Sequence, residues 1–184
     1  MPSRTLFIDR DGTLNRNPSR GAFVWRWEDW RFLDHAEEAL RRFSRGGYAI
    51  IVVSNQSGVG RGLYTAADVD NLHERVRRVL LQRGVEVAGF YYCPHLSADN
   101  CECRKPRPGL LFRAAAQLDI DLQQSIFAGD AARDVEAGRR AGTRTAFIYG
   151  DAYPDQRTPA MAARPDFVAR DLLELHDLVA GDAK

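Results

Sequence analysis

The sequence has little of three features that would each indicate a particular class of protein: cysteine, net charge and long apolar runs. Three cysteines among 184 residues are too few, and odd in number, for a disulfide framework. Lysine plus arginine number 26 against 25 aspartate plus glutamate, so charge gives no reason to expect nucleic acid or a membrane as partner. No apolar run approaches the roughly 20 residues that cross a bilayer. Residues Met1 to Arg4 run directly into a strand-like stretch, not a leader, so we expect a cytoplasmic protein.

What the sequence does contain is a regular alternation of short apolar runs and amphipathic stretches. With 45% hydrophobic residues it is long enough to bury a core, and we expect one domain over residues 1–184. Six apolar runs predict strands, at 5–8, 48–53, 87–92, 125–128, 144–149 and 167–168. The amphipathic stretches predict helices, at 36–46, 65–84, 108–118, 134–141 and 171–179. Strict alternation of the two predicts an α/β fold, a doubly wound and mostly parallel sheet.

Polar residues directly follow four of the predicted strands. They are Asp9, Ser54, Cys93 and Asp130. In doubly wound folds the ligand lies in the crevice at the carboxyl ends of the strands. We therefore expect these positions to surround one functional site.

The first of these positions opens a stretch in which two carboxylates, Asp9 and Asp11, are separated by one residue. Because side chains alternate along a strand, both can point to the same side. Asp9 could then attack phosphorus and form an acyl phosphate. Asp11 could protonate the leaving oxygen and later deprotonate the attacking water. The stretch alone leaves open a second interpretation, an Asp-Gly turn with both acids in solvent.

The other strand ends add the groups that phosphoryl transfer needs. Ser54 and the residues after it offer a hydroxyl and backbone N–H groups to a phosphoryl oxygen. Lys105 can neutralise charge on the transferred group. Mg²⁺ prefers a few oxygen ligands, which Asp9, Asp130 and the backbone carbonyl of Asp11 can supply. Together, these residues favour the interpretation of Asp9 and Asp11 as catalytic groups of a phosphoryl-transfer enzyme over the interpretation as a solvent-exposed Asp-Gly turn.

In their order along the chain, these residues resemble the four motifs of the haloacid dehalogenase superfamily. The matching positions are Asp9-Arg10-Asp11-Gly12-Thr13, Ser54, Lys105, and Gly129-Asp130 with Asp134. The resemblance covers roughly residues 5–150 and implies a Rossmann-like phosphatase. No long insertion follows the first motif or separates the second from the third, where family members carry cap domains. The chain therefore resembles a capless member.

The resemblance also implies a role for each matching side chain. Asp9 is the nucleophile and Asp11 the general acid and base. Ser54 and Lys105 clamp the phosphoryl group. The magnesium ligands are Asp9, Asp11 and Asp130, supported by Asp134.

A second cluster of chemistry-bearing residues follows the third predicted strand. Cys93, His95, Cys101 and Cys103 form a Cys-x-His…Cys-x-Cys arrangement. Three thiolates and one imidazole suit tetrahedral Zn²⁺, and a complete set of four ligands indicates a structural site. The alternative is three reduced surface cysteines beside a solvent-facing histidine. The other histidines have no second candidate ligand nearby and are expected to be surface or hydrogen-bonded residues: His35, His73 and His176.

The zinc segment narrows the resemblance to the phosphatases of D-glycero-D-manno-heptose 1,7-bisphosphate and of histidinol phosphate. Asn-Gln-Ser-Gly…Arg-Gly at residues 55–62 is similar to the heptose branch, whereas histidinol phosphatases usually have Asp-Gly at Ser57-Gly58. Arg-Lys-Pro-Arg-Pro-Gly at residues 104–109 also resembles the heptose branch, and the short zinc loop fits either. The implied reaction is removal of the 7-phosphate. The substrate-binding candidates are Thr13, Asn55, Gln56, Arg61 and Arg104, of which the two arginines would hold the distal part.

Two departures from the heptose pattern stand out. Many heptose phosphatases have lysine directly after the Gly-Asp of the fourth motif, where this chain has Ala131. This removes one cation from the phosphate pocket, which Arg133 could replace. The segment 24–30 contains all three tryptophans and could form an aromatic lid over the site. We favour the alternative, in which at least one of these tryptophans packs on the sheet.

Four rival functions have different requirements. A histidinol-phosphate phosphatase would share the mechanism, and a polynucleotide 3′-phosphatase would want a basic, aromatic groove that the near-zero net charge disfavours. A phospho-accepting regulator would not need Asp11 as acid and base or a zinc segment, so these residues favour turnover. A catalytically idle, zinc-stabilised binding module would not need every catalytic position filled, as they are here. We expect a small phosphorylated metabolite as partner, no nucleic acid, no membrane, and a monomer.

Overall fold

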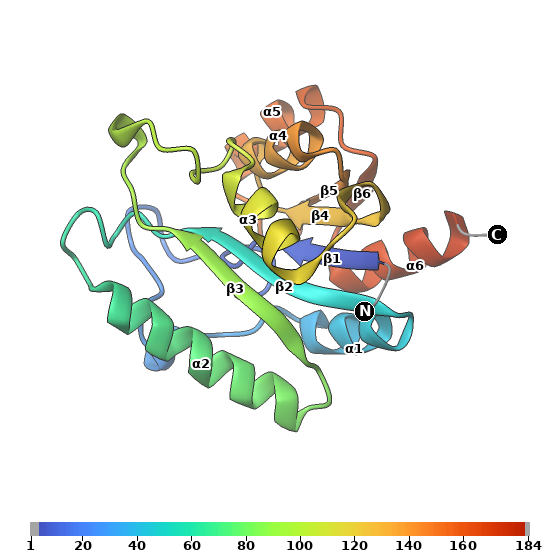
Figure 1. The fold of residues 1–184 in the computed structure, drawn as a ribbon, viewed down its shortest axis with the longest axis horizontal. Helices are drawn as coiled ribbons and strands as arrows, with labels where there is room; N and C mark the ends of the chain where they lie inside the picture. The colour runs from blue at the N-terminus through green and yellow to red at the C-terminus, as the bar shows by residue number, and fades with distance from the viewer. Residues whose placement is uncertain (1–3, 183–184) are drawn as a thin grey trace.

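The computed structural model describes residues 4–182, so expectations about residues 1–3, 183 and 184 lie outside it. Six parallel strands form one sheet in the order β3-β2-β1-β4-β5-β6 (Figure 1). Their bounds are Arg4–Ile8 (β1), Tyr48–Asn55 (β2), Val87–Cys93 (β3), Ile126–Gly129 (β4), Arg144–Ile148 (β5) and Phe167–Ala169 (β6). Every pair is in parallel register, for example Phe7 beside Ile51 and Phe127. The predicted doubly wound α/β fold is confirmed.

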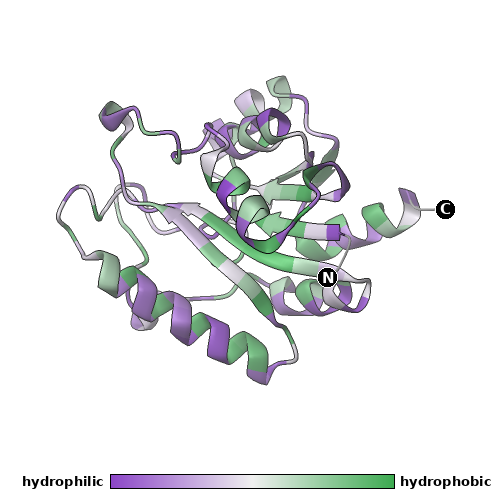
Figure 2. Cartoon of the chain, viewed as in Figure 1, coloured by the Kyte–Doolittle hydropathy of each residue, from purple (hydrophilic) through white to green (hydrophobic). Residues whose placement is uncertain are grey.

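Helices cover both faces of this sheet (Figure 1). They are α1 (Ala36–Arg45), α2 (Ala66–Gln82), α3 (Gly109–Leu118), α4 (Ala132–Ala141), α5 (Arg157–Ala162) and α6 (Leu172–Asp182). Side chains alternate along β1, so Leu6 and Ile8 pack with α1, α2 and α6 while Phe7 packs with α3 and α4. Figure 2 shows the result, apolar strands between helices whose outer faces are polar. None of the helices within residues 4–182 is long and apolar enough to span a membrane.

The local sequence explains why the elements start and stop where they do. Thr65 caps α2, since its hydroxyl accepts from the Asp68 backbone and the Asp68 carboxylate accepts in return. Helix α4 begins at Ala132, two residues before the predicted start. Helix α5 was not predicted, because its six residues carry too little apolar periodicity.

The segment between β1 and α1 is the longest connection at the carboxyl ends of the strands. In residues 9–35 the structure has one short 3-10 turn, Trp27–Asp29, and no inserted domain. Residues 94–108, between β3 and α3, likewise hold one 3-10 turn, Ser97–Asp99. The expected capless architecture therefore holds across residues 4–182.

Candidate active site

The polar residues that follow the strands meet at the carboxyl edge of the sheet. Asp9 follows β1, Ser54 is the last residue but one of β2, and Asp130 follows β4. β1 lies between β2 and β4 and pairs with both. Chain connections run in opposite directions from this point, which is where doubly wound folds bind ligands.

Three buried carboxylates form the centre of the site. Asp9, Asp130 and Asp134 each offer an oxygen, and these atoms lie within 4.8 Å of one another. Burial, Asp9 and Asp134 raise the pKa of Asp130 to about 8. One oxygen of Asp130, Oδ1, is buried without a hydrogen-bond partner among the described residues. Crowded anions with an unsatisfied oxygen are what a divalent cation would neutralise, so these acids fit a Mg²⁺ site.

The ammonium of Lys105 lies against this carboxylate cluster. Its Nζ is 2.8 Å from Asp9 Oδ1 and 2.7 Å from Asp134 Oδ1, and it donates to the Val53 carbonyl at 2.9 Å. Asn55 holds the lysine backbone, accepting from its N–H and donating to its C=O, each at 3.1 Å. The side chain is fully buried, so the ion pairs act with little screening from water.

Asp11 lies apart from that cluster, in a hydrogen-bond network of its own. Its carboxylate accepts from the Arg10 guanidinium, from Asn15 at 2.9 Å and from Gln56 at 3.2 Å. Gln56 also donates to Ser54 Oγ at 3.3 Å and accepts from Tyr64 at 3.0 Å. Asp9 and Asp11 therefore differ in environment, one facing cations and acids, the other held by neutral amides and one arginine.

Gly12 allows the chain to turn between these two environments. Its φ is +82°, and a Cβ there would lie 2.2 Å from Asp130 Oδ2 and 2.3 Å from Asn17 Nδ2. A side chain is excluded both by the backbone conformation and by the space. Asn17 donates to Asp130 at 2.7 Å and to the carbonyl of Asp151 at 2.8 Å. Asn17 could not be predicted from the sequence, since an isolated asparagine in a long loop matches no motif.

The predicted zinc ligands converge at the end of β3. The Cys103 sulfur lies 3.2 Å from Cys93 Sγ and 3.2 Å from His95 Nδ1, and Cys101 Sγ lies 3.6 Å from Cys93 Sγ. Ligands on a tetrahedral zinc ion lie roughly 3.5–3.8 Å apart. The separations here, 3.2–3.6 Å, are slightly shorter, so small side-chain movements would place the four atoms around one ion. Burial and the Cys103 thiol raise the pKa of Cys93 to about 12, so this sulfur needs a cation nearby to become a thiolate.

Comparison with known proteins agrees with this geometry. Residues 4–165 match the family model described as polynucleotide kinase 3 phosphatase. The D-glycero-beta-D-manno-heptose-1,7-bisphosphate 7-phosphatase of Pasteurella multocida is 33% identical over 184 residues, which cover 97% of each chain. The chain belongs to the haloacid dehalogenase phosphatases.

Two further similarities extend over most of this phosphatase. The D-glycero-alpha-D-manno-heptose-1,7-bisphosphate 7-phosphatase of Campylobacter jejuni is 34% identical over 151 residues, covering 82% of this chain and 85% of the relative. A crystal structure of the D,D-heptose 1,7-bisphosphate phosphatase of B. bronchiseptica with magnesium and phosphate superposes with a TM-score of 0.84. The two chains are 30% identical, and the match covers 97% of this chain and 99% of that one. The chain is a phosphoric monoester hydrolase.

The substrate-binding candidates of the phosphatase fall into two groups. Thr13 is buried, and its Oγ1 has no partner among residues 4–182, so it is free to meet a ligand. The amides of Asn55 and Gln56 are already bonded, to Lys105 and to Asp11. Arg61 is exposed and Arg104 half-buried, the latter donating to the His95 carbonyl at 3.1 Å.

The aromatic segment of the phosphatase is divided between core and site. Trp30 is buried in the core, which confirms that at least one tryptophan packs on the sheet. Trp25 stacks on Tyr64 with ring centroids 5.8 Å apart, and Phe23 meets the same ring edge-on at 5.7 Å. Because Tyr64 donates to Gln56, this segment connects to the network around Asp11.

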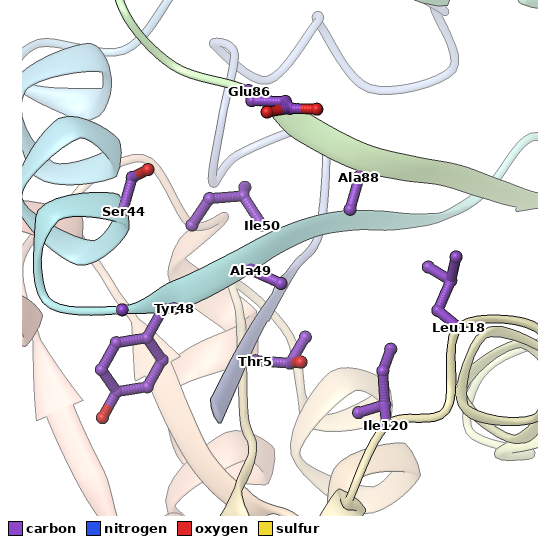
Figure 3. Close-up of a pocket in the computed structure, with 10 residues that line it drawn as sticks. Thr5, Ser44, Tyr48, Ala49, Ile50, Glu86, Ala88, Leu118 and Ile120 are labelled. Atoms are coloured by element: carbon purple, nitrogen blue, oxygen red, sulfur yellow. The ribbon is translucent and has the colours of Figure 1, made fainter. Parts of the chain in front are cut away.

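An apolar pocket of about 330 Å³ lies at the other end of the phosphatase sheet (Figure 3). Thr5, Tyr48 and Ala49 line it, from the amino ends of β1 and β2. The carboxylates lie at the carboxyl ends of these strands, so the pocket is separate from the candidate active site.

Proposed function

We propose that this phosphatase removes the 7-phosphate of D-glycero-D-manno-heptose 1,7-bisphosphate through an aspartyl-phosphate intermediate. The observation that carries the chemistry is the placement of Asp9. Its Oδ1 accepts from the Arg10 backbone N–H at 2.7 Å and lies 2.8 Å from Lys105 Nζ. Both contacts fix the carboxylate in one orientation at the carboxyl end of β1. The substrate assignment is supported by relatives of that name at 33–34% identity.

In the first half of the reaction, an oxygen of Asp9 attacks phosphorus and the bond from phosphorus to the sugar oxygen breaks. Asp11 gives its proton to that sugar oxygen. Lys105 balances charge on the phosphoryl oxygens and on Asp9. Ser54 would contact the transferred phosphoryl group, and its hydroxyl is already oriented by a hydrogen bond from Gln56.

In the second half, water attacks the acyl phosphate and Asp11, now a carboxylate, takes the proton of that water. The bond between phosphorus and Asp9 breaks, which releases inorganic phosphate and restores both acids. The same carboxylate thus serves as acid and then as base, which requires that Asp11 be held in place in both steps.

The proposal includes a magnesium ion held by Asp9, Asp130 and the backbone carbonyl of Asp11, with Asp134 in support. The buried, unpartnered oxygen of Asp130 supports this assignment. When bound, the ion supplies positive charge that lets an anionic phosphate approach an anionic nucleophile. The relative crystallised with magnesium and phosphate has the same fold.

We also propose a structural Zn²⁺ at Cys93, His95, Cys101 and Cys103. All four candidate ligands are provided by the protein, which leaves no open position for substrate. The last ligand lies two residues before Lys105. The zinc ion would therefore fix the loop that carries this lysine.

The distal part of the substrate is assigned to Arg61 and Arg104, with Thr13 near the phosphoryl group. The bonding of Asn55 and Gln56 supports a different use for these two amides, orientation of Lys105 and Asp11. We further propose that the enzyme is cytoplasmic and acts as a monomer, as the sequence predicts.

Two other substrates are tested beside the heptose. Histidinol phosphate would use the same catalytic groups. The 3′-phosphorylated oligonucleotide is included because the matching family model is described as polynucleotide kinase 3 phosphatase. A formal net charge of +1 disfavours a nucleic acid substrate.

The deciding experiment is phosphate release with Mg²⁺ from both anomers of the heptose bisphosphate, histidinol phosphate and a 3′-phosphorylated oligonucleotide. We expect kcat/KM for one heptose anomer to exceed that for histidinol phosphate by about 100-fold or more. Both anomers are needed because relatives of both kinds are similar to this chain. A preference for histidinol phosphate or the oligonucleotide would overturn the substrate assignment and leave the phosphatase chemistry in place.

A further inference from the structure

The residue between the two catalytic acids is buried and charged. Arg10 has no exposed side-chain surface. A guanidinium in the interior is costly unless it is paired, and among residues 4–182 its one ion-pair partner is Asp11. Arg10 was not among the residues to which the sequence assigned a role.

The contacts of Arg10 are arranged around the Asp11 carboxylate. Nη2 donates to Oδ1 at 3.0 Å and to Oδ2 at 2.9 Å, and Nε donates to Oδ1 at 3.3 Å. The backbone N–H of the same residue donates to Asp9. One residue therefore orients the attacking carboxylate through its backbone and the neighbouring carboxylate through its side chain.

The guanidinium is itself held from three sides. Nη2 also donates to the Val24 carbonyl, and the group lies 5.9 Å from the centroid of the Trp30 ring. Nη1 lies 3.5 Å from Nε2 of His73, a long contact. His73 is itself buried and stacks on Phe90 with ring centroids 4.7 Å apart.

His73 is suited to receive a cation as a neutral ring. Burial, Arg10 and Arg77 lower the pKa of His73 well below its ordinary value. A guanidinium has no acceptor, so the nitrogen that faces it must carry the lone pair. This places the histidine proton on Nδ1 and leaves Nε2 as an acceptor for Arg10.

We propose that Arg10 is a positioning residue for Asp11, and that His73 holds Arg10 in place for that task. The inference rests on the proposed role of Asp11 as acid and base. A lysine could keep the charge but not the donation from Nε and Nη2 to both carboxylate oxygens. Loss of that geometry would misplace Asp11 without removing it.

The test compares substrates that do and do not need a proton on the leaving group. Arg10→Lys is expected to lower kcat on an alkyl or sugar phosphate by roughly 100-fold, with much less change in KM. With 2,4-dinitrophenyl phosphate, whose leaving group needs no proton, the burst of the first turnover should stay within about threefold of wild type. An equal loss on both substrates, or no loss on either, would overturn the proposal.

A double-mutant cycle tells positioning from general damage to the fold. In an Asp11→Asn background, Arg10→Lys should cause little further loss, because the residue on which it acts is already inactive. Losses that multiply would contradict the proposal. Arg78→Lys is the matched control, since Arg78 is exposed on the same helix as His73, pairs with Glu74 and touches neither catalytic acid, and its kcat should equal that of wild type.

The His73 pair covers the case in which Arg10→Lys does not fold. His73→Gln keeps an acceptor and His73→Leu does not, while both keep a side chain of similar size. The leucine variant should lose about tenfold more kcat on the alkyl phosphate than the glutamine variant. Equal rates for the two variants would rule out the role of His73. The double-mutant cycle can still be interpreted if the heptose assignment is wrong, because it can be measured with any phosphate monoester that the wild type hydrolyses.

Discussion

Lys105 shows how much of this site depends on single side chains. An ammonium carries three protons, and three oxygens lie within 2.9 Å of it, from Asp9, Asp134 and Val53. These contacts leave it no proton free for a substrate oxygen. In the proposed mechanism its contribution would therefore be positive charge and the fixed direction of Asp9.

The first prediction concerns the nucleophile. Asp9→Asn should lower turnover by about 10³-fold or more, since an amide cannot form the acyl phosphate. The fold should survive, because the variant also removes one of three mutually repelling acids. Phosphate release and circular dichroism measure the two effects. Asp119→Asn, at an exposed position whose αL backbone suits asparagine, is the control. Wild-type turnover in Asp9→Asn would disprove the mechanism.

At the scale of elements, the apolar runs predicted all six strands to within two residues at each end. They did so because strands buried on both faces carry a continuous apolar signal. The polar positions after them were also readable, since topology alone brings carboxyl ends together. The segment of residues 9–35 was not readable. Arg10 and Asn15 are both buried in this segment. Arg10 depends on the carbonyl of Val24, 14 residues away, and Asn15 on the carboxylate of Asp11. No local sequence pattern predicts such contacts.

The burial of His73 is a second case of this kind. The sequence predicted a surface or hydrogen-bonded residue, and the structure places it in the interior beside Arg10. His73 follows Leu72 on α2, and both side chains are buried. His73 is buried because β3 packs along this helix. The helix was predictable from its own sequence, whereas the neighbour of each helical residue was not.

The second prediction concerns the zinc-binding loop. Cys101→Ser should lower zinc content and decrease the free energy of unfolding by roughly 3 kcal/mol or more, because a structural ion contributes directly to stability. Metal analysis and thermal unfolding measure both. Ala98→Ser, on the exposed turn Ser97–Asp99 of the same loop and not one of the four ligands, should change neither. Native protein without zinc would show the assignment to be wrong.

The third prediction concerns the loop after β2. A Cβ on Gly58 would lie 2.0 Å from the ring of Tyr64, which donates to Gln56. Gly58→Ala should cost about 1–3 kcal/mol of stability and lower kcat, since Tyr64 must move and take Gln56 with it. Gly181→Ala, where a Cβ meets nothing within 4 Å, is the control. Unchanged kcat in Gly58→Ala would show that Tyr64 does not position the catalytic network.

At the scale of the molecule, the site is a concentration of negative charge on a nearly neutral chain. The sheet order places β1 beside β4, so Asp9 and Asp130 are neighbours however the rest of the chain is arranged. The fold stabilises this arrangement through its two apolar faces rather than through the site. The catalytic edge is thus a place where folding and function oppose each other.

The fourth prediction follows from that opposition. The pKa of Asp130 is raised to about 8 by burial, Asp9 and Asp134, whereas an unfolded aspartate titrates near 3.9. Between these values the folded state binds the extra proton, so stability falls as pH rises and stops falling above about pH 8. In EDTA we expect Tm to increase by about 2–5 °C from roughly pH 8.5 to pH 7.

Calorimetry with and without Mg²⁺ checks this prediction. Bound metal should raise Tm by mass action and weaken its dependence on pH. Asp130→Asn should abolish most of the dependence in EDTA. A metal-free protein whose Tm is flat over this range would contradict the charge crowding that the geometry implies.

The two ends of the described chain lie on the far side of the molecule from the acids. Arg4 begins β1 at the amino edge of the sheet, and the carboxylate of Asp182 accepts a hydrogen bond at 2.8 Å from the guanidinium of Arg144, the first residue of β5. An affinity handle, a bead or a second enzyme attached at Arg4 or at Asp182 would start from the edge of the sheet opposite the carboxylates. The protein could therefore be tethered to a surface through either of these two positions with its candidate active site still facing the solution.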